Sequence, residues 1–149
     1  MTHATTRRGW LIAVAALAVI GPPGEAWAQV THPARGSPER AAILDALRGP
    51  VARLIGGRIE FEVSQMRVFG DWAYVSATPR RPGGQAIDWS QTRYAADMKA
   101  DAMSDLVLGL LRRQGGGWRV VTHAIGPTDV AWIDWIDRYR APRQVFSDE

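Results

Sequence analysis

The chain has 149 residues, no cysteine and a formal net charge of +3 at pH 7. The lack of cysteine excludes disulfides, a thiol nucleophile and a lipid-modified cysteine anchor. Acidic residues are interspersed among the basic ones, and the only lysine is Lys99, so no stripe of positive charge is present that could follow a phosphate backbone. We therefore expect no nucleic-acid partner.

Residues 1–28 have the layout of a secretory signal peptide: two adjacent arginines, the apolar run Trp10–Ile20 and a small-x-small cleavage pattern. The apolar run is shorter than the roughly 20 residues that a spanning helix needs, which makes a retained membrane anchor the weaker alternative. We expect cleavage between Ala28 and Gln29, a periplasmic or secreted protein, and no stable membrane insertion afterwards. The arginine pair also fits a twin-arginine signal, which leaves the export route open.

Cleavage there leaves 121 of the 149 residues, the size of one ordinary domain. Residues 29–36 have little apolar content and are expected to form a flexible lead-in. Residues 37–149 are expected to form a single soluble α+β domain. The signal contains two arginines and one glutamate, so its removal reduces the net charge from +3 to +2.

The first predicted element is a helix that begins after Ser37. Ser37 can cap the helix, and Pro38 suits its first turn. Apolar side chains then recur at helical spacing: Ile43, Leu44, Leu47, Val51, Leu54 and Ile55. Gly49-Pro50 predicts a kink or a junction between two short helices, and Gly56-Gly57 ends the segment.

A bulged β-hairpin is predicted next. Apolar and polar residues alternate over Ile59–Val63, and the apolar phase then slips by one residue, which predicts a β-bulge near Ser64-Gln65. Gly70-Asp71 has the composition of a type II′ hairpin loop, which would pair Phe69 with Trp72.

A long connection and a second hairpin follow. Pro79–Thr92 reads as a loop, either a functional lid or plain disorder, and Asp88–Met103 as a segment with a short helix. The apolar run Leu106–Leu111 predicts a strand buried on both faces, joined by a glycine turn to the alternating segment Trp118–Ile125.

A short C-terminal helix carrying Trp132 to Tyr139 completes the pattern, with Thr128 or Asp129 as its cap. The fold class predicted from this order is α+β. An amphipathic helix packs on a curved antiparallel sheet of about four strands, in two layers, with the short helix at the end.

Three segments carry a resemblance: Gly70–Val75, Trp118–Val121 and Gly126–Trp132. They resemble signatures of a group of small uncharacterised exported bacterial proteins. The order of elements is similar to that of the cystatin-like and nuclear-transport-factor-2-like folds, in which a helix packs into a bent antiparallel sheet. The resemblance spans about residues 37–146 and implies a fold and an exported location, but no activity.

One candidate site is catalytic. His123 could act as a general base in a cavity of the curved sheet, with Asp129 to orient it, in a small-molecule hydrolase or isomerase. The alternative is that His123 is a packing residue and Asp129 a helix cap. No cofactor or metal is expected, because the sequence has neither a ligand spacing such as His-x-x-x-His nor a phosphate-binding glycine motif.

The second candidate site is a binding surface. Phe69, Trp72 and Tyr74 share a strand face with Arg67, an aromatic and basic combination found at recognition patches, and Trp89 in the long loop could close over it. The alternative is that the C-terminal helix or the long loop covers this face. We favour non-catalytic binding of a small molecule or an envelope protein, and a structural or accessory role in the envelope also stays open.

Overall fold

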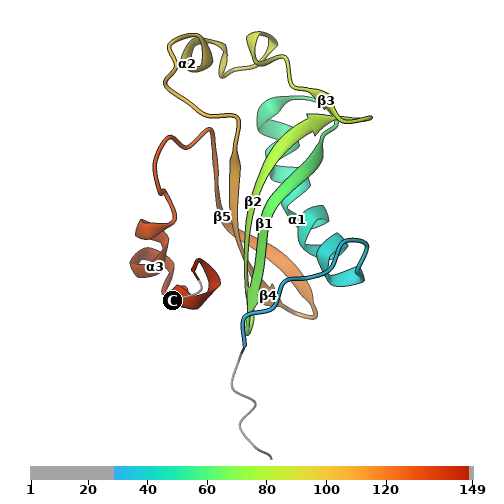
Figure 1. Cartoon of the computed structure of the whole chain (residues 1–149), viewed down its shortest axis with the longest axis vertical. Helices are drawn as coiled ribbons and strands as arrows, with labels where there is room; N and C mark the ends of the chain where they lie inside the picture. Colours follow the sequence, from blue (N-terminus) through green and yellow to red (C-terminus); the bar gives the residue numbers. More distant parts are fainter. Residues whose placement is uncertain (1–28, 148–149) are drawn as a thin grey trace, which may run out of the picture.

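The chain folds as a helix followed by an antiparallel sheet and a short C-terminal helix, which confirms the predicted α+β class. A computed structural model describes residues 29–147, so the predicted signal peptide lies outside the described residues. The elements are α1 (Pro38–Ile55), β1 (Glu60–Phe69), β2 (Trp72–Arg81), β3 (Gln85–Ala86), the 3-10 turn η1 (Trp89–Gln91), α2 (Ala95–Lys99), β4 (Val107–Gln114), β5 (Gly117–Ile125), α3 (Ile133–Tyr139) and the 3-10 turn η2 (Arg143–Val145), as Figure 1 shows.

The two predicted hairpins, β1–β2 and β4–β5, lie side by side in one open sheet. The strand order is β1-β2-β4-β5, all pairs are antiparallel, and the short β3 is attached to β2. Strands β1 and β5 are therefore the edges of the sheet. Among the helices of residues 29–147, none combines the length and the apolar character needed to cross a membrane.

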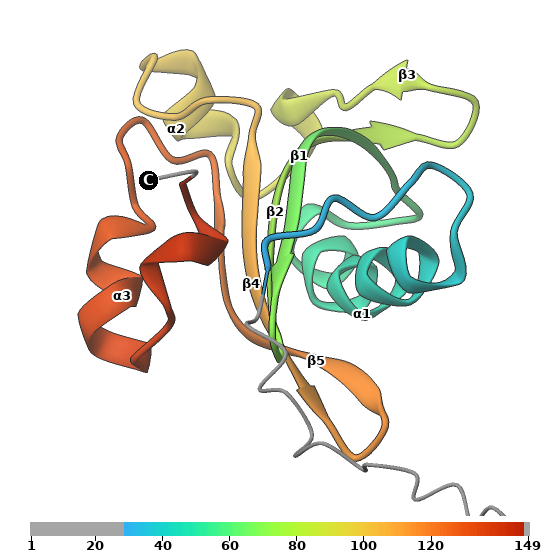
Figure 2. The same ribbon diagram turned by 60° about the horizontal axis from the view of Figure 1, so that its bottom comes forward.

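The sheet has a core on each face, because successive side chains of a strand point to opposite sides. On one face α1 packs its buried residues Ile43, Leu47, Val51 and Ile55 against the sheet. On the other, Tyr74, Leu108 and Leu110 contact Trp135, Val145 and Phe146. Figures 1 and 2 show α1 and α3 on opposite sides of the strands. The expected two layers are thus wrong: the C-terminal segment forms a third.

Helix α1 is continuous through Pro50, so the alternative of two short helices is wrong. The residue before a proline normally clashes with its ring through Cβ, but here that residue is Gly49. The buried stripe also continues across the proline from Leu47 to Val51. The Ser37 side chain caps the helix by accepting a hydrogen bond from the Arg40 N–H at 3.3 Å, as predicted.

The first hairpin matches its prediction in register and in turn type. The ladder shifts at Ser64, where the bulge was expected, and Phe69 pairs with Trp72. Gly70 has a φ of 57°, whereas Asp71 has no positive φ, as a type II′ turn requires.

The predicted loop over Pro79–Thr92 is wrong in its first part, because β2 continues to Arg81 and then pairs with β3. Pairing between β2 and β4 ends at Ala77, so one side of β2 carries no β4 ladder beyond that point. Pro79 lies beyond that point. A proline has no backbone N–H and is tolerated in a strand where one side is unpaired.

The predicted caps of the last helix are also wrong. Helix α3 begins at Ile133 after Trp132, without a side-chain cap, and neither Thr128 nor Asp129 takes that role. The N–H of Ile133 donates instead to the carbonyl of Val130, so a backbone turn leads into the helix.

The lead-in, expected to be flexible, is fastened to the edge of β1. Thr31 and Val68 exchange two backbone hydrogen bonds, of 2.8 and 2.9 Å. The Nδ1 atom of His32 lies 3.2 Å from the Met66 carbonyl oxygen. Thr31 thus forms an isolated β-bridge to the edge of the sheet, and the His32 side chain contacts the same strand.

Candidate functional site

The predicted catalytic pair is not assembled. His123 lies opposite Gly109 in the β4–β5 ladder and is half-buried. Burial and the positive charge of Arg53 on α1 both lower the pKa of His123 from its ordinary value. Asp129 is exposed, and no hydrogen bond joins it to His123 within residues 29–147. The charge that acts on the imidazole is therefore positive, and within residues 29–147 no carboxylate orients it through a hydrogen bond.

The predicted aromatic face lies largely inside the protein. Tyr74 is 3% exposed and makes an edge contact with Phe146, with ring centroids 5.3 Å apart. Desolvation of the phenol raises the pKa of Tyr74 to about 12. Arg67 is also buried, whereas Phe69 and Trp72 are half-buried. The C-terminal segment covers this face, as the alternative held, and the face belongs to the second core.

Trp89 lies on the other side of the sheet from Trp72. It is half-buried, packs against the α1 core and makes an edge contact with Tyr94 at 6.1 Å between centroids. It therefore cannot close over the face that carries Trp72, which was its predicted role.

Most arginines of the sheet have structural partners. Arg80 pairs with Glu62 at 2.8 Å, Arg81 donates to the Gly56 carbonyl at 2.6 Å, Arg112 lies 5.0 Å above the Trp72 ring, and Arg113 lies 4.4 Å above the Trp118 ring and pairs with Glu39. These side chains contact groups on other elements of the fold.

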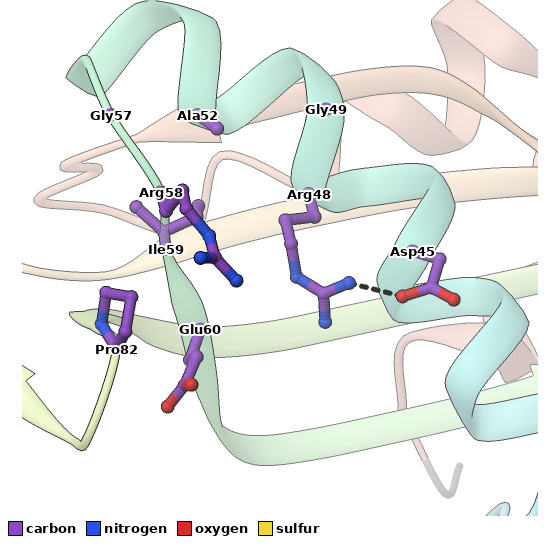
Figure 3. A pocket seen from close by; sticks show the side chains of 9 residues that line it. All are labelled: Asp45, Arg48, Gly49, Ala52, Gly57, Arg58, Ile59, Glu60 and Pro82. Carbon is purple, nitrogen blue, oxygen red and sulfur yellow. Dashed lines mark hydrogen bonds and ion pairs between the residues drawn. The ribbon is translucent and has the colours of Figure 1, made fainter.

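A groove of 580 Å³ between α1 and the start of β1 is the strongest candidate site. Helix α1 contributes Asp45, Arg48 and Ala52 on one stripe, and the segment after the helix contributes Arg58, Ile59 and Glu60. Pro82, after β2, also lines the groove, and Ile59 is buried. Figure 3 shows the two guanidinium groups directed into the hollow between helix and strand.

The connection between α1 and β1 is tied in place, which fixes where Arg58 points. Gly56 and Gly57 both have φ above +80°, a conformation that favours glycine. The Arg81 guanidinium donates to the carbonyls of Gly56 and Arg58, at 2.6 and 3.2 Å. An arginine from the far end of β2 thus positions the segment that carries Arg58.

The charges in the groove are not equally available. Arg48 forms an ion pair with Asp45, three residues earlier on the helix. In the part of the chain that the structure describes, the side chains of Arg58 and Glu60 have no hydrogen-bond or ion-pair partner. Among residues 29–147, the groove therefore offers one cation and one carboxylate without a partner, beside an apolar floor.

A second groove, of 510 Å³, continues the first along the same helix and strand. The two share Asp45 and Arg48. The second is lined further by Arg35, Arg40, Ala41, Leu44, Phe61 and Val63, among others. Together they form one trough beside β1.

Sequence patterns did not single out this trough. Helical spacing places Asp45, Arg48 and Ala52 on one stripe, and Gly56-Gly57 predicts the turn before Arg58. Nothing in the sequence says that the stripe faces the edge strand. Among residues 29–147 no cluster of three or more His, Asp or Glu side chains could hold a metal ion.

Comparison with known proteins found no matching family model, curated protein or solved structure.

Proposed function

We propose that the protein is a non-catalytic binding domain of the cell envelope that holds a small polar ligand in the groove between α1 and β1. The ligand would place an anionic group against Arg58 and a hydrogen-bond donor against Glu60. The observation that carries this proposal is that these two side chains share a groove and have no partner among the described residues. A volume of 580 Å³ lies within the range of ~300–1,000 Å³ typical of small-molecule sites.

Of the two groups without a partner among the described residues, Arg58 is suited to binding rather than to proton transfer. A guanidinium stays protonated in proteins, so Arg58 can hold an anion but cannot act as a general base. His123, the residue of the catalytic alternative, lines neither groove. The geometry therefore favours recognition of charge over catalysis.

Nuclear magnetic resonance with three matched probes tests this proposal. The full chain is expressed, the exported protein is labelled with ¹⁵N, and glycylglycine, acetate and methylammonium are titrated in turn. Glycylglycine carries both groups, so it should shift the amide signals of residues 57–60 and bind more tightly than either single-charge probe.

The matched variants are Arg58→Gln and Arg53→Gln. Arg53 lies in the last turn of α1, near Arg58 in the sequence, but does not line the groove. Arg58→Gln should weaken glycylglycine binding at least about tenfold, the order expected for a lost charge-assisted hydrogen bond. Arg53→Gln should leave it unchanged. Equal binding by Arg58→Gln and the native chain would overturn the proposal.

A further inference from the structure

Strand β1 is an edge strand that the chain itself covers only in part. Thr31 bonds to Val68, and His32 contacts the carbonyl of Met66. The lead-in then turns away toward α1, where the Pro33 carbonyl accepts a hydrogen bond from the Arg40 side chain at 3.3 Å. In the part of the chain that the structure describes, no strand lies on the outer side of the first half of β1, residues 60–64.

Backbone groups on this open half face outward. In an antiparallel ladder the N–H and C=O of alternate residues point to opposite sides, and Val68 points outward to Thr31. The bulge at Ser64 absorbs one residue, so Phe61 and Val63 also point outward. Pro79 lies opposite Phe61 and has no N–H to donate. This agrees with a position where β1 and β2 exchange no backbone hydrogen bond and the Phe61 groups point outward. No backbone bond reaches Phe61 or Val63 from that side within residues 29–147.

The trough runs along this open edge, with Arg35 and Arg40 at the end near the lead-in and Arg58 at the other end. Ala41 and Leu44 of α1 face it together with Phe61 and Val63, which provides an apolar wall. It leads to the guanidinium of Arg58, which has no partner within residues 29–147. From Val63 to Arg58 the span is about 16 Å at ~3.3 Å per residue, the length of five or six extended residues.

We propose that an extended polypeptide with a free C-terminal carboxylate adds as an antiparallel strand to residues 60–64 of β1 and places that carboxylate against Arg58. The proposal rests on the proposed function of the groove. The lead-in shows the direction, because Thr31 pairs with Val68 in antiparallel sense and the chain runs on toward Met66. A peptide continuing that direction ends at Arg58.

The side chains of β1 also select the occupant. Glu60 and Glu62 are exposed, and Glu62 is paired with Arg80, so Glu60 is the carboxylate of this face that has no partner within residues 29–147. Pairing with a second copy of β1 would bring a like charge against Glu60, which is destabilising. A peptide with alternating apolar and basic residues complements both sides of the edge. Its apolar residues would face Ala41 and Leu44, and its basic residues would face the glutamates.

Fluorescence anisotropy with the hexapeptide Lys-Val-Lys-Val-Lys-Val, labelled at its N-terminus, tests the inference on the exported protein. The peptide with a free carboxylate should bind at least tenfold more tightly than its C-terminal amide. Arg58→Gln should remove that difference and leave binding of the amide form unchanged. The shifted sequence Val-Lys-Val-Lys-Val-Lys should bind more weakly, because its lysines would face the apolar wall.

N-methylation of the peptide tests strand addition without altering the protein. Methylating the amides of one alternate set should abolish binding, whereas methylating the other set should have little effect. Equal effects of both sets would overturn the inference. If glycylglycine still binds through Arg58 in that case, the proposed function stands alone; if neither probe depends on Arg58, both proposals fail.

Discussion

Replacement of Gly109 by alanine tests how closely α1 packs on the sheet. Gly109 is in β4, and a Cβ atom added there would lie 2.9 Å from both methyl carbons of Leu47. Contacts this short do not occur between real side chains, so one group must move. Leu47 is fully buried, which leaves its methyl groups no room to swing aside.

The expected cost follows from two opposing effects. Overpacking a filled core destabilises by roughly 1–3 kcal/mol. Alanine offsets part of this, because glycine in a strand interior is less favourable by roughly 0.5–1 kcal/mol. We therefore expect Gly109→Ala to lower the free energy of unfolding by about 1 kcal/mol, within a range of roughly 0–2.5 kcal/mol. Urea unfolding followed by tryptophan fluorescence should show a lower midpoint and an unchanged slope.

Two further variants show whether the contact with Leu47 is the cause. Gly117 has no atoms within 4 Å of its Cβ position and no positive φ, so Gly117→Ala should change stability by less than about 0.5 kcal/mol. In a Leu47→Ala background, which opens space under the helix, Gly109→Ala should lose its cost. The same loss in both backgrounds would refute the reasoning.

Three further outcomes follow from burial, charge and capping. Arg53→Gln should raise the pKa of His123 in an NMR titration, and an unchanged pKa would contradict the assigned cause. Because the folded-state pKa of His123 lies below that of the unfolded chain, its contribution to stability should be complete above pH ~6.5 and decline as the pH falls. Tyr74, with its pKa of about 12, should ionise last in an absorbance titration, and stability should fall as the pH rises above ~10; the Tyr74→Phe variant should lack that dependence. Ser37→Ala should destabilise by about 1 kcal/mol in urea unfolding, because the Arg40 N–H loses its acceptor; no change would show that the cap is dispensable.

Local pattern was sufficient for the first hairpin. The slip of apolar phase near Ser64 and the composition of Gly70-Asp71 are consequences of chain geometry within a few residues, and each has one common structural solution. The pairing of Phe69 with Trp72 follows from the loop length alone. The bulge and the register were therefore predictable without knowledge of the rest of the fold.

The aromatic face shows what the sequence pattern of a strand cannot predict, namely which element covers it. A strand side with Arg67, Tyr74 and an adjacent tryptophan looks the same in sequence whether water or another element covers it. Here Phe146, more than 70 positions later in the chain, provides the cover. The same limit applies to His123 and Asp129, since proximity in sequence did not bring them into contact.

At the candidate site, the sequence likewise does not distinguish an arginine with a structural partner from one without. Arg58 follows Gly56-Gly57, and Arg81 precedes Pro82 and two glycines, so both read as residues at the edge of a turn. The difference arises from the carbonyl groups at the end of α1, which lie within reach of Arg81 and take its guanidinium as donor. Once Arg81 satisfies those carbonyls, Arg58 has no structural partner in the described part of the chain and its charge is directed into the groove. Within residues 29–147, Arg81 thus makes the structural contact of this turn, and the Arg58 side chain makes none.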